Sequence, residues 1–132
     1  MSKKFSIVIP SFNNINYLKL CIESILRNSS TSHQLIIHIN GVDKDTELFL
    51  HQKKISYTKT INNVGLCSGV NLAAKKAETN YILYAHDDMY FLPNWDTELD
   101  EEVKKINHNN FYLSMTHISY MDGVKGDLQH IK

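Results

Sequence analysis

The sequence carries no net charge, because 14 Lys and Arg residues balance 14 Asp and Glu residues. Proteins built mainly to bind nucleic acid usually show a basic excess or patch, so this balance argues against that class. The chain also lacks an apolar run long enough to cross a bilayer. The apolar stretch that follows Lys3 and Lys4 is too short for a secretory signal.

Cysteine is scarce, and the spacing of cysteine and histidine excludes several kinds of site. Cys21 and Cys67 form no CxxC pair, which favours a reduced, cytoplasmic compartment. The histidines show no HxxxH or HExxH spacing, so we do not expect a zinc site. The absence of GxSxG and of a paired Cys/His arrangement argues against a nucleophilic hydrolase. At 132 residues, the chain fits one domain, residues 1–132.

Short apolar runs alternate with amphipathic segments along the first two thirds of the chain. We predict strands over 5–10, 34–40, 55–60 and 81–86, and a further strand over 111–119. We predict helices over 15–27, 43–54, the later part of 62–78, and 94–106. Asn94 or Asp96 is expected to cap the last helix. This alternation predicts an α/β fold with a mostly parallel sheet and helices on both faces.

Polar residues follow each of the first four predicted strands, at 11–14, 40–43, 62–65 and 86–88. In open parallel sheets, ligands bind outside the carboxyl ends of the strands, near a switch in strand order. The sequence therefore predicts a ligand site where these four segments meet.

Two adjacent carboxylates, Asp87 and Asp88, interrupt the apolar stretch "YILYAHDDMYFLPNW". Carboxylate oxygens suit Mg²⁺ or Mn²⁺, which bridge protein carboxylates to substrate phosphates. The alternative is a turn in which the two acids cap local amides. An isolated acidic pair favours the turn, but the apolar surroundings favour a ligand role. For His86, packing against Tyr84 is favoured over a metal or phosphate contact.

The segment "NNVGLCSGVN" has glycines four apart, unlike GxGxxG, and no GKS or GKT follows it. Nicotinamide and P-loop sites are therefore disfavoured. Two interpretations of Gly65 and Gly69 stay open. They allow the backbone to approach a ligand at a helix N-terminus, or they permit tight packing of the helix on the sheet. Trp95 is expected in the core rather than under a sugar.

Four segments taken in order resemble the nucleotide-sugar-binding half of a family 2 glycosyltransferase with the GT-A fold, a three-layer Rossmann-like sheet. They are "SIVIPSFNNINYLKLCIESIL", "LIIHINGVDKDT", "NNVGLCSGVNLAAKKA" and "YILYAHDDMYFLPNWDTEL". The resemblance implies transfer of a sugar from a nucleoside-diphosphate sugar, with UDP favoured, to a hydroxyl of a glycan or other acceptor. It also implies inversion at the sugar, Mn²⁺ or Mg²⁺ on the diphosphate, and peripheral membrane association.

The resemblance implies a nucleotide-sugar site drawn from all four strand ends: Pro10, Ser11, Phe12, Asn40, Asn63, Gly65, Asn71, His86 and Asp87. The first three stand in the loop that cradles the base and ribose. Asn40 stands where the family commonly has an aspartate, so it keeps hydrogen bonding but carries no charge. Val70 replaces a residue that is basic in many members.

His86, Asp87 and Asp88 align with the DxD motif of the family. Asp88 keeps the metal-binding position, Asp87 supports it, and His86 replaces the first acid. We expect the general base to come from a later segment than this chain contains, and do not assign it to Asp122. The alternatives are a nucleotide-binding module without turnover and, less favoured, a nucleotidyltransferase. The latter usually has a glycine- and lysine-bearing first loop, which "PSFNN" does not supply.

Overall fold

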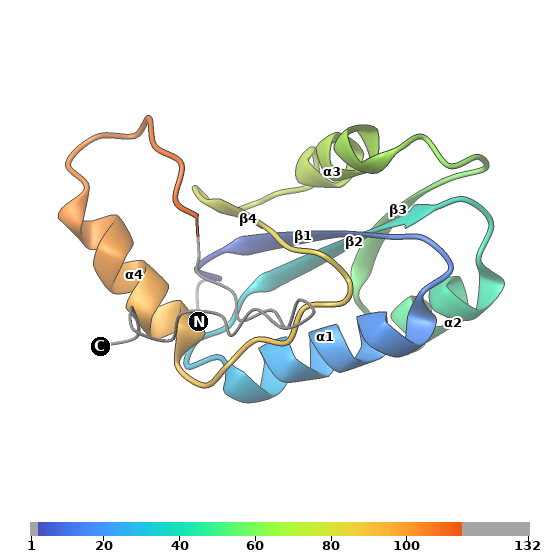
Figure 1. Ribbon diagram of the computed structural model, residues 1–132, viewed down its shortest axis with the longest axis horizontal. Coiled ribbons are helices and arrows are strands. Elements are labelled where there is room, and N and C mark those ends of the chain that lie inside the picture. Colours follow the sequence, from blue (N-terminus) through green and yellow to red (C-terminus); the bar gives the residue numbers. More distant parts are fainter. Residues whose placement is uncertain (1–2, 115–132) are drawn as a thin grey trace, which may run out of the picture.

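The computed structural model describes residues 3–114, in which four strands alternate with four helices (Figure 1). The elements in chain order are β1 (Ser6–Ser11), α1 (Ile15–Asn28), β2 (Gln34–Asn40), α2 (Lys44–Gln52), β3 (Ser56–Thr60), α3 (Leu66–Ala74), β4 (Ile82–Tyr84) and α4 (Trp95–Lys105). The strands form one parallel sheet in the order β3-β2-β1-β4. The predicted α/β fold is confirmed.

The two central strands are the most buried part of the sheet. Every residue of β1 is buried, and six of the seven residues of β2 are buried. Strands covered on both faces read as continuous β-branched runs, as "SIVIP" and "LIIHI" do. Their register pairs Ile7 with Leu35 and Ile9 with Ile37. Burial on both faces therefore determines the positions of β1 and β2 in the sheet.

Helices cover both faces of the sheet, as the alternation predicts. Figure 1 shows α1 and α2 against one face and α3 against the other. Ile7, Ile9 and Ile37 belong to the larger core on the α1 side. Val8 and Ile36 point the other way and pack with Ala73 of α3. Alternate strand residues thus face opposite helices, which is the geometry of a three-layer α/β fold.

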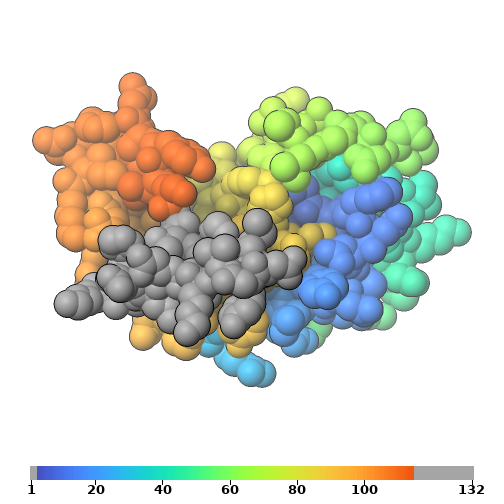
Figure 2. Space-filling model, in the orientation of Figure 1, coloured from blue at the N-terminus to red at the C-terminus, as the bar shows by residue number. Residues whose placement is uncertain are grey.

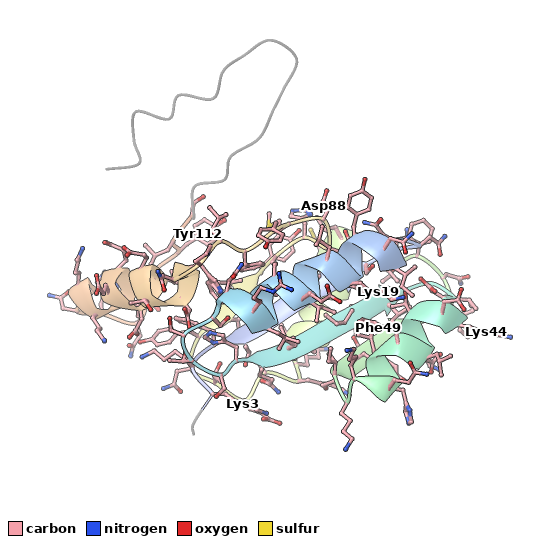
Figure 3. All side chains as sticks on the ribbon, turned by 90° about the horizontal axis from the view of Figure 1, so that it is seen from below. Lys3, Lys19, Lys44, Phe49, Asp88 and Tyr112 are labelled. Atoms are coloured by element: carbon pink, nitrogen blue, oxygen red, sulfur yellow. The ribbon has the colours of Figure 1, made fainter. Side chains whose placement is uncertain are left out.

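On the α1 face, a cation–aromatic contact joins the two helices. Lys19 Nζ of α1 lies 5.2 Å from the ring centroid of Phe49 of α2, and Figure 3 shows the two side chains together. Among residues 3–114, no helix combines the length and the apolar character needed to cross a bilayer.

Two predicted strands differ from the structure. β4 covers only Ile82–Tyr84, rather than 81–86, because it pairs with β1 over the first half of that strand. Residues 111–114 are not in a strand, and the rest of the predicted strand over 111–119 lies outside the described residues.

Asn94, one of the two predicted caps of α4, is its N-cap residue, but with φ +65° its side chain makes no capping hydrogen bond. The Asp96 carboxylate is buried and accepts hydrogen bonds from the N–H groups of Ser30 and Thr31 at 2.9 Å, and from His33 Nε2 at 3.1 Å. Burial alone would raise the pKa of Asp96, but these donors lower it to about 2. The Asp96 carboxylate therefore satisfies the backbone N–H groups that follow α1 and links α4 to that segment.

Trp95 lies in the core, as expected. It is buried, its ring centroid is 4.8 Å from that of Phe91 in an edge-to-face contact, and its indole N–H donates to Ser29. It contributes to the packing of α4 on the body of the domain.

Candidate functional site

The strand order places a switch point between β1 and β4. From β1 the chain moves outward to β2 and β3, then returns to β4 on the other side of β1. The crevice outside the carboxyl ends of β1 and β4 is where such sheets bind ligands. Pro10 lies in β1, as the predicted strand over 5–10 has it, and Ser11 is the last residue of β1 rather than part of the loop that the resemblance implied. Ser11 Oγ donates to Asp87 Oδ2 at 2.7 Å across this point.

Helix α1 holds the segment that follows β4. The thiol of Cys21 donates to the His86 carbonyl at 3.6 Å. Ser24 Oγ accepts the Phe91 N–H at 2.9 Å, and Asn28 Nδ2 donates to the Phe91 carbonyl at 2.6 Å. These bonds hold both ends of a segment with little regular structure against α1. The acidic pair lies within this segment.

The two carboxylates differ in their surroundings. Asp87 is half-buried against Ser11, whereas Asp88 is exposed at the surface beside α1 (Figure 3). Both carboxylates affect the buried thiol beneath them. Burial and then the charges of Asp87 and Asp88 raise the pKa of Cys21 to about 12, so this thiol stays protonated.

His86 packs on Tyr84, as the sequence favoured. The Tyr84 hydroxyl and His86 Nε2 are 2.9 Å apart, and the ring centroids are 5.0 Å apart. The His86 carbonyl accepts the Met89 N–H at 3.4 Å, which closes a turn around the acidic pair. Both the turn and the exposed carboxylate are therefore present in one segment.

The donor set fits a divalent cation that is completed by a ligand. Residues 3–114 contain no group of three or more His, Cys, Asp or Glu side chains placed to hold a metal ion by themselves. Mg²⁺ in particular is usually held by one or two carboxylates together with water and substrate phosphates. Asp87 and Asp88 supply such a pair of hard oxygen donors.

The loops after β1 and β2 meet at Phe12. A Cβ atom placed on Gly41, whose φ is +120°, would lie 3.4 Å from Phe12 Cε2. The Phe12 ring remains 52% exposed. Phe12 is therefore an exposed aromatic residue that lies against the loop after β2.

Asn40 does not point its amide into open space. Its Nδ2 donates to the Gly65 carbonyl at 3.2 Å, and its Oδ1 accepts the Val64 N–H at 2.7 Å. Asn63 Oδ1 accepts the Gly65 N–H at 2.9 Å. The residue predicted to read the ligand is thus engaged with the loop that follows β3.

The structure separates the roles of the two glycines. Gly65 precedes α3 with φ +82° and has open space where a Cβ would stand, so its backbone conformation is what requires glycine. Gly69 is buried, and a Cβ there would lie 2.8 Å from Cδ2 of His38. Gly69 therefore serves close packing of α3 on the sheet, which is one of the two interpretations left open.

Sequence reasoning missed His38, which is fully buried in β2. Its Nδ1 is 2.8 Å from Thr58 Oγ1, and its Nε2 is 3.4 Å from Thr60 Oγ1. The available signal was a single ionisable residue inside the apolar run "QLIIHIN". Burial lowers the pKa of His38, which keeps the imidazole neutral.

Tyr84, the last residue of β4, lies two residues before His86 and close to the acidic pair. The pKa of Tyr84 is raised by burial and by the nearby groups of Cys67, Asp87 and Asp88. Figure 2 shows the yellow surface around β4 recessed between α3 and the orange segment that follows α4. Asn71 is exposed on α3, beyond the first turn. Asp122 lies outside the described residues.

Comparison with known proteins shows what this chain is similar to. The family described as Glycosyl transferase family 2 matches residues 6–131. An uncharacterized glycosyltransferase of Rickettsia bellii is 30% identical over 123 residues, which is 90% of this chain and 17% of that protein. The protein CgeD of Bacillus subtilis is 25% identical over 119 residues, which is 82% of this chain and 27% of CgeD.

Among solved structures, S. aureus TarS 1–349 aligns with a TM-score of 0.69 at 17% identity, over 77% of this chain and 32% of TarS. The same protein in complex with UDP aligns with a TM-score of 0.68. This likeness shows the fold. The chain spans less than a third of the length of each protein named here.

Proposed function

The chain belongs to glycosyltransferase family 2, and from this premise we propose that it binds a nucleoside-diphosphate sugar for transfer of the sugar to a hydroxyl acceptor. The observation that carries the proposal is the hydrogen bond between Ser11 and Asp87. It brings the ends of β1 and β4 together at the switch point, beside the exposed carboxylate of Asp88. UDP is the favoured nucleotide, because the structural neighbour S. aureus TarS was solved in complex with UDP.

The nucleotide is proposed to lie across the loops that follow β1 and β2. The exposed Phe12 is proposed to offer a stacking face for a base, and Gly41 lies against one edge of its ring. Stacking on an aromatic face is tolerant of the identity of the base. This arrangement positions the nucleotide without deciding by itself which base is bound.

The diphosphate is proposed to lie between the acidic pair and the start of α3. The first N–H groups of a helix have no partner within the helix, and the helix dipole favours an anion there. Gly65 leaves that end open, since nothing lies within 4 Å of the position where its Cβ would stand. Cys67, in the first turn, is exposed on the same side as Tyr84.

Asp88, with Asp87 in support, would hold Mn²⁺ or Mg²⁺ against that diphosphate. When bound, the cation supplies Lewis-acid stabilisation of the leaving nucleoside diphosphate. Ser11 restrains one Asp87 oxygen, and α1 restrains the backbone on both sides of the pair. These contacts hold the Asp87 carboxylate and the backbone around the pair in place before any ligand arrives, which is the preorganisation that such sites require.

Inversion at the sugar requires a general base that takes a proton from the acceptor hydroxyl. We place that base, and the acceptor, outside the strand ends described above. A glycan or another hydroxyl compound is the proposed acceptor. We propose a cytoplasmic location with peripheral membrane association, and the free thiols of Cys21 and Cys67 fit a reduced compartment.

The second candidate is a nucleotide-binding module without turnover. Asn40 directs both of its polar atoms to the Val64–Gly65 backbone, an arrangement that requires no transfer chemistry. It leaves nucleotide binding intact, so the two candidates share their first test.

Calorimetric titration of UDP and other nucleoside diphosphates, with and without Mn²⁺, tests the proposal. We expect binding that is strengthened by Mn²⁺. Absence of binding to every nucleotide in both conditions would contradict both candidates. Binding of a UDP-sugar without hydrolysis or transfer, in the full-length gene product, would favour the binding module.

A further inference from the structure

We propose that His38 is a positioning residue, which sets the loop at residues 62–65 through a chain of hydrogen bonds that passes through Thr60. The inference rests on the proposed function only in the claim that this loop receives the nucleotide. It concerns a residue in the middle of β2, beneath the site rather than in it.

His38 lies in a row of β2 residues that changes from apolar to polar toward the carboxyl end of the strand. Residues two apart share a face, so Ile36, His38 and Asn40 all face α3, where Ile36 packs with Ala73. Asn40, at the end of the row, binds the loop directly through Val64 and the carbonyl after it. His38 is the step below, and its cross-strand partner in β3 is Thr58.

The hydrogen-bond roles along the chain follow from counting protons. Thr60 Oγ1 donates its only proton to the Asn62 carbonyl at 2.8 Å. The same oxygen lies 3.4 Å from His38 Nε2, so Nε2–H must be the donor to it. The other ring nitrogen, Nδ1, then accepts from the Thr58 hydroxyl at 2.8 Å. One tautomer therefore satisfies both threonines and the first residue of the loop.

The packing keeps the imidazole in this orientation. His38 is fully buried, and a Cβ on Gly69 of α3 would lie 2.8 Å from its Cδ2. Such close contact leaves the ring little room to turn. The charged groups of the neighbouring elements are engaged elsewhere: Lys59 of β3 pairs with Glu47, and Lys76, just beyond α3, donates to the Tyr57 carbonyl.

The test compares two isosteric variants, each of which removes one threonine hydroxyl that hydrogen-bonds to His38. Thr60→Val cuts the link to the Asn62 carbonyl, whereas Thr58→Val removes the shorter bond but leaves the loop link intact. Amide hydrogen exchange is measured at Val64 and Gly65 in the free protein. Affinity for UDP with Mn²⁺ and the free energy of unfolding are measured alongside.

In Thr60→Val we expect the two amides to exchange about fivefold faster and the UDP affinity to fall by about the same factor, as one hydrogen bond would give. In Thr58→Val we expect neither change, although both variants lose stability. Equal exchange at Val64 and Gly65 in the two variants would overturn the inference. If the wild-type protein binds no nucleotide, the proposed function fails, while the exchange comparison still decides whether Thr60 sets the loop, and the His38 variants described next decide the role of the imidazole.

A second pair of variants tests the imidazole itself. His38→Gln keeps a nitrogen near the Nε2 position, and His38→Asn keeps one near the Nδ1 position. We expect His38→Gln to retain slow exchange at Val64 and Gly65, and His38→Asn to lose it. Similar exchange in both would show that the residue only fills space. If either variant fails to fold, the threonine pair decides.

Discussion

Ser11 Oγ lies 2.7 Å from Asp87 Oδ2, and this hydrogen bond joins the ends of the two strands on either side of the switch in strand order. It also makes the two carboxylates of the acidic pair different. Asp87 is half-buried and held by one oxygen, while Asp88 stays exposed. A fixed carboxylate beside a free one suits a cation that arrives with its ligand.

Replacing Ser11 by alanine removes the only hydroxyl that the structure places on Asp87. A hydrogen bond to a charged group contributes about 1.5–3 kcal/mol, so we expect Mn²⁺-dependent UDP affinity to fall about tenfold or more. Isothermal titration calorimetry measures the change. Ser56→Ala, at the exposed start of β3, is the control and should leave the affinity unchanged. Wild-type affinity in Ser11→Ala would show that Asp87 needs no such restraint.

Asp88→Asn should abolish most of the gain in nucleotide affinity that Mn²⁺ provides. The amide keeps the shape of the side chain but removes the charge that a divalent cation requires. Because Asp88 is exposed, the free energy of unfolding should change by less than about 0.5 kcal/mol. Glu101→Gln, an exposed acid on α4, is the matched control. A Mn²⁺ effect of full size in Asp88→Asn would remove this residue from the metal site.

The two thiols should differ sharply in reactivity. Cys67 is exposed in the first turn of α3, whereas Cys21 is buried with its pKa raised to about 12, chiefly by burial. The thiolate is the reactive form, so a maleimide should label Cys67 alone in the native protein. We expect saturating UDP with Mn²⁺ to slow that labelling several-fold, as peptide mass spectrometry would show. Labelling of Cys67 at an unchanged rate would place the nucleotide elsewhere, and Cys67→Ser controls for background.

Stability should fall as the pH is lowered. The pKa of Asp96 is about 2 in the folded protein against an ordinary 3.8, so its stabilisation is full above about pH 4 and is lost as the pH falls toward 2. The difference corresponds to about 2 kcal/mol. Burial lowers the pKa of His33, so protonation of the unfolded chain begins to cost stability below about pH 6.5.

Urea unfolding between pH 3 and pH 8 measures this dependence. Asp96→Asn should be less stable at pH 7 and should show a flatter profile between pH 4 and pH 3 than the wild type. An identical slope in both proteins would mean that other carboxylates cause the acid sensitivity.

The sequence predicts best what burial determines. The apolar runs of β1 and β2 and the helical spacing of α1 place these elements within a residue or so of their observed bounds. Their mutual burial leaves little alternative. β4 was predicted too long because its end is set by pairing, which stops at Tyr84 opposite Val8. The local sequence of β4 does not show where its hydrogen bonding to β1 ends.

The convergence of the strand ends was predicted, but the hydrogen bonds among them were not. The convergence of the strand ends follows from parallel topology, and the packing of His86 on Tyr84 follows from their spacing. The preference of Asp96 for the Ser30 and Thr31 amides depends on contacts more than 60 positions away in the chain. His38 and Gly69 are also distant in the chain, and their close contact depends on the packing of α3 on the sheet.

Asn40 shows what an amide achieves that the aspartate common in the family would not. It accepts from the Val64 N–H and donates to the Gly65 carbonyl, so it closes a small circuit with the loop. An ionised carboxylate would keep the first bond and turn a second oxygen toward that carbonyl, 3.2 Å away, where two acceptors repel. The exchange of one side-chain oxygen for an NH₂ group therefore gives Asn40 two hydrogen bonds to the backbone of the loop, and its role becomes structural.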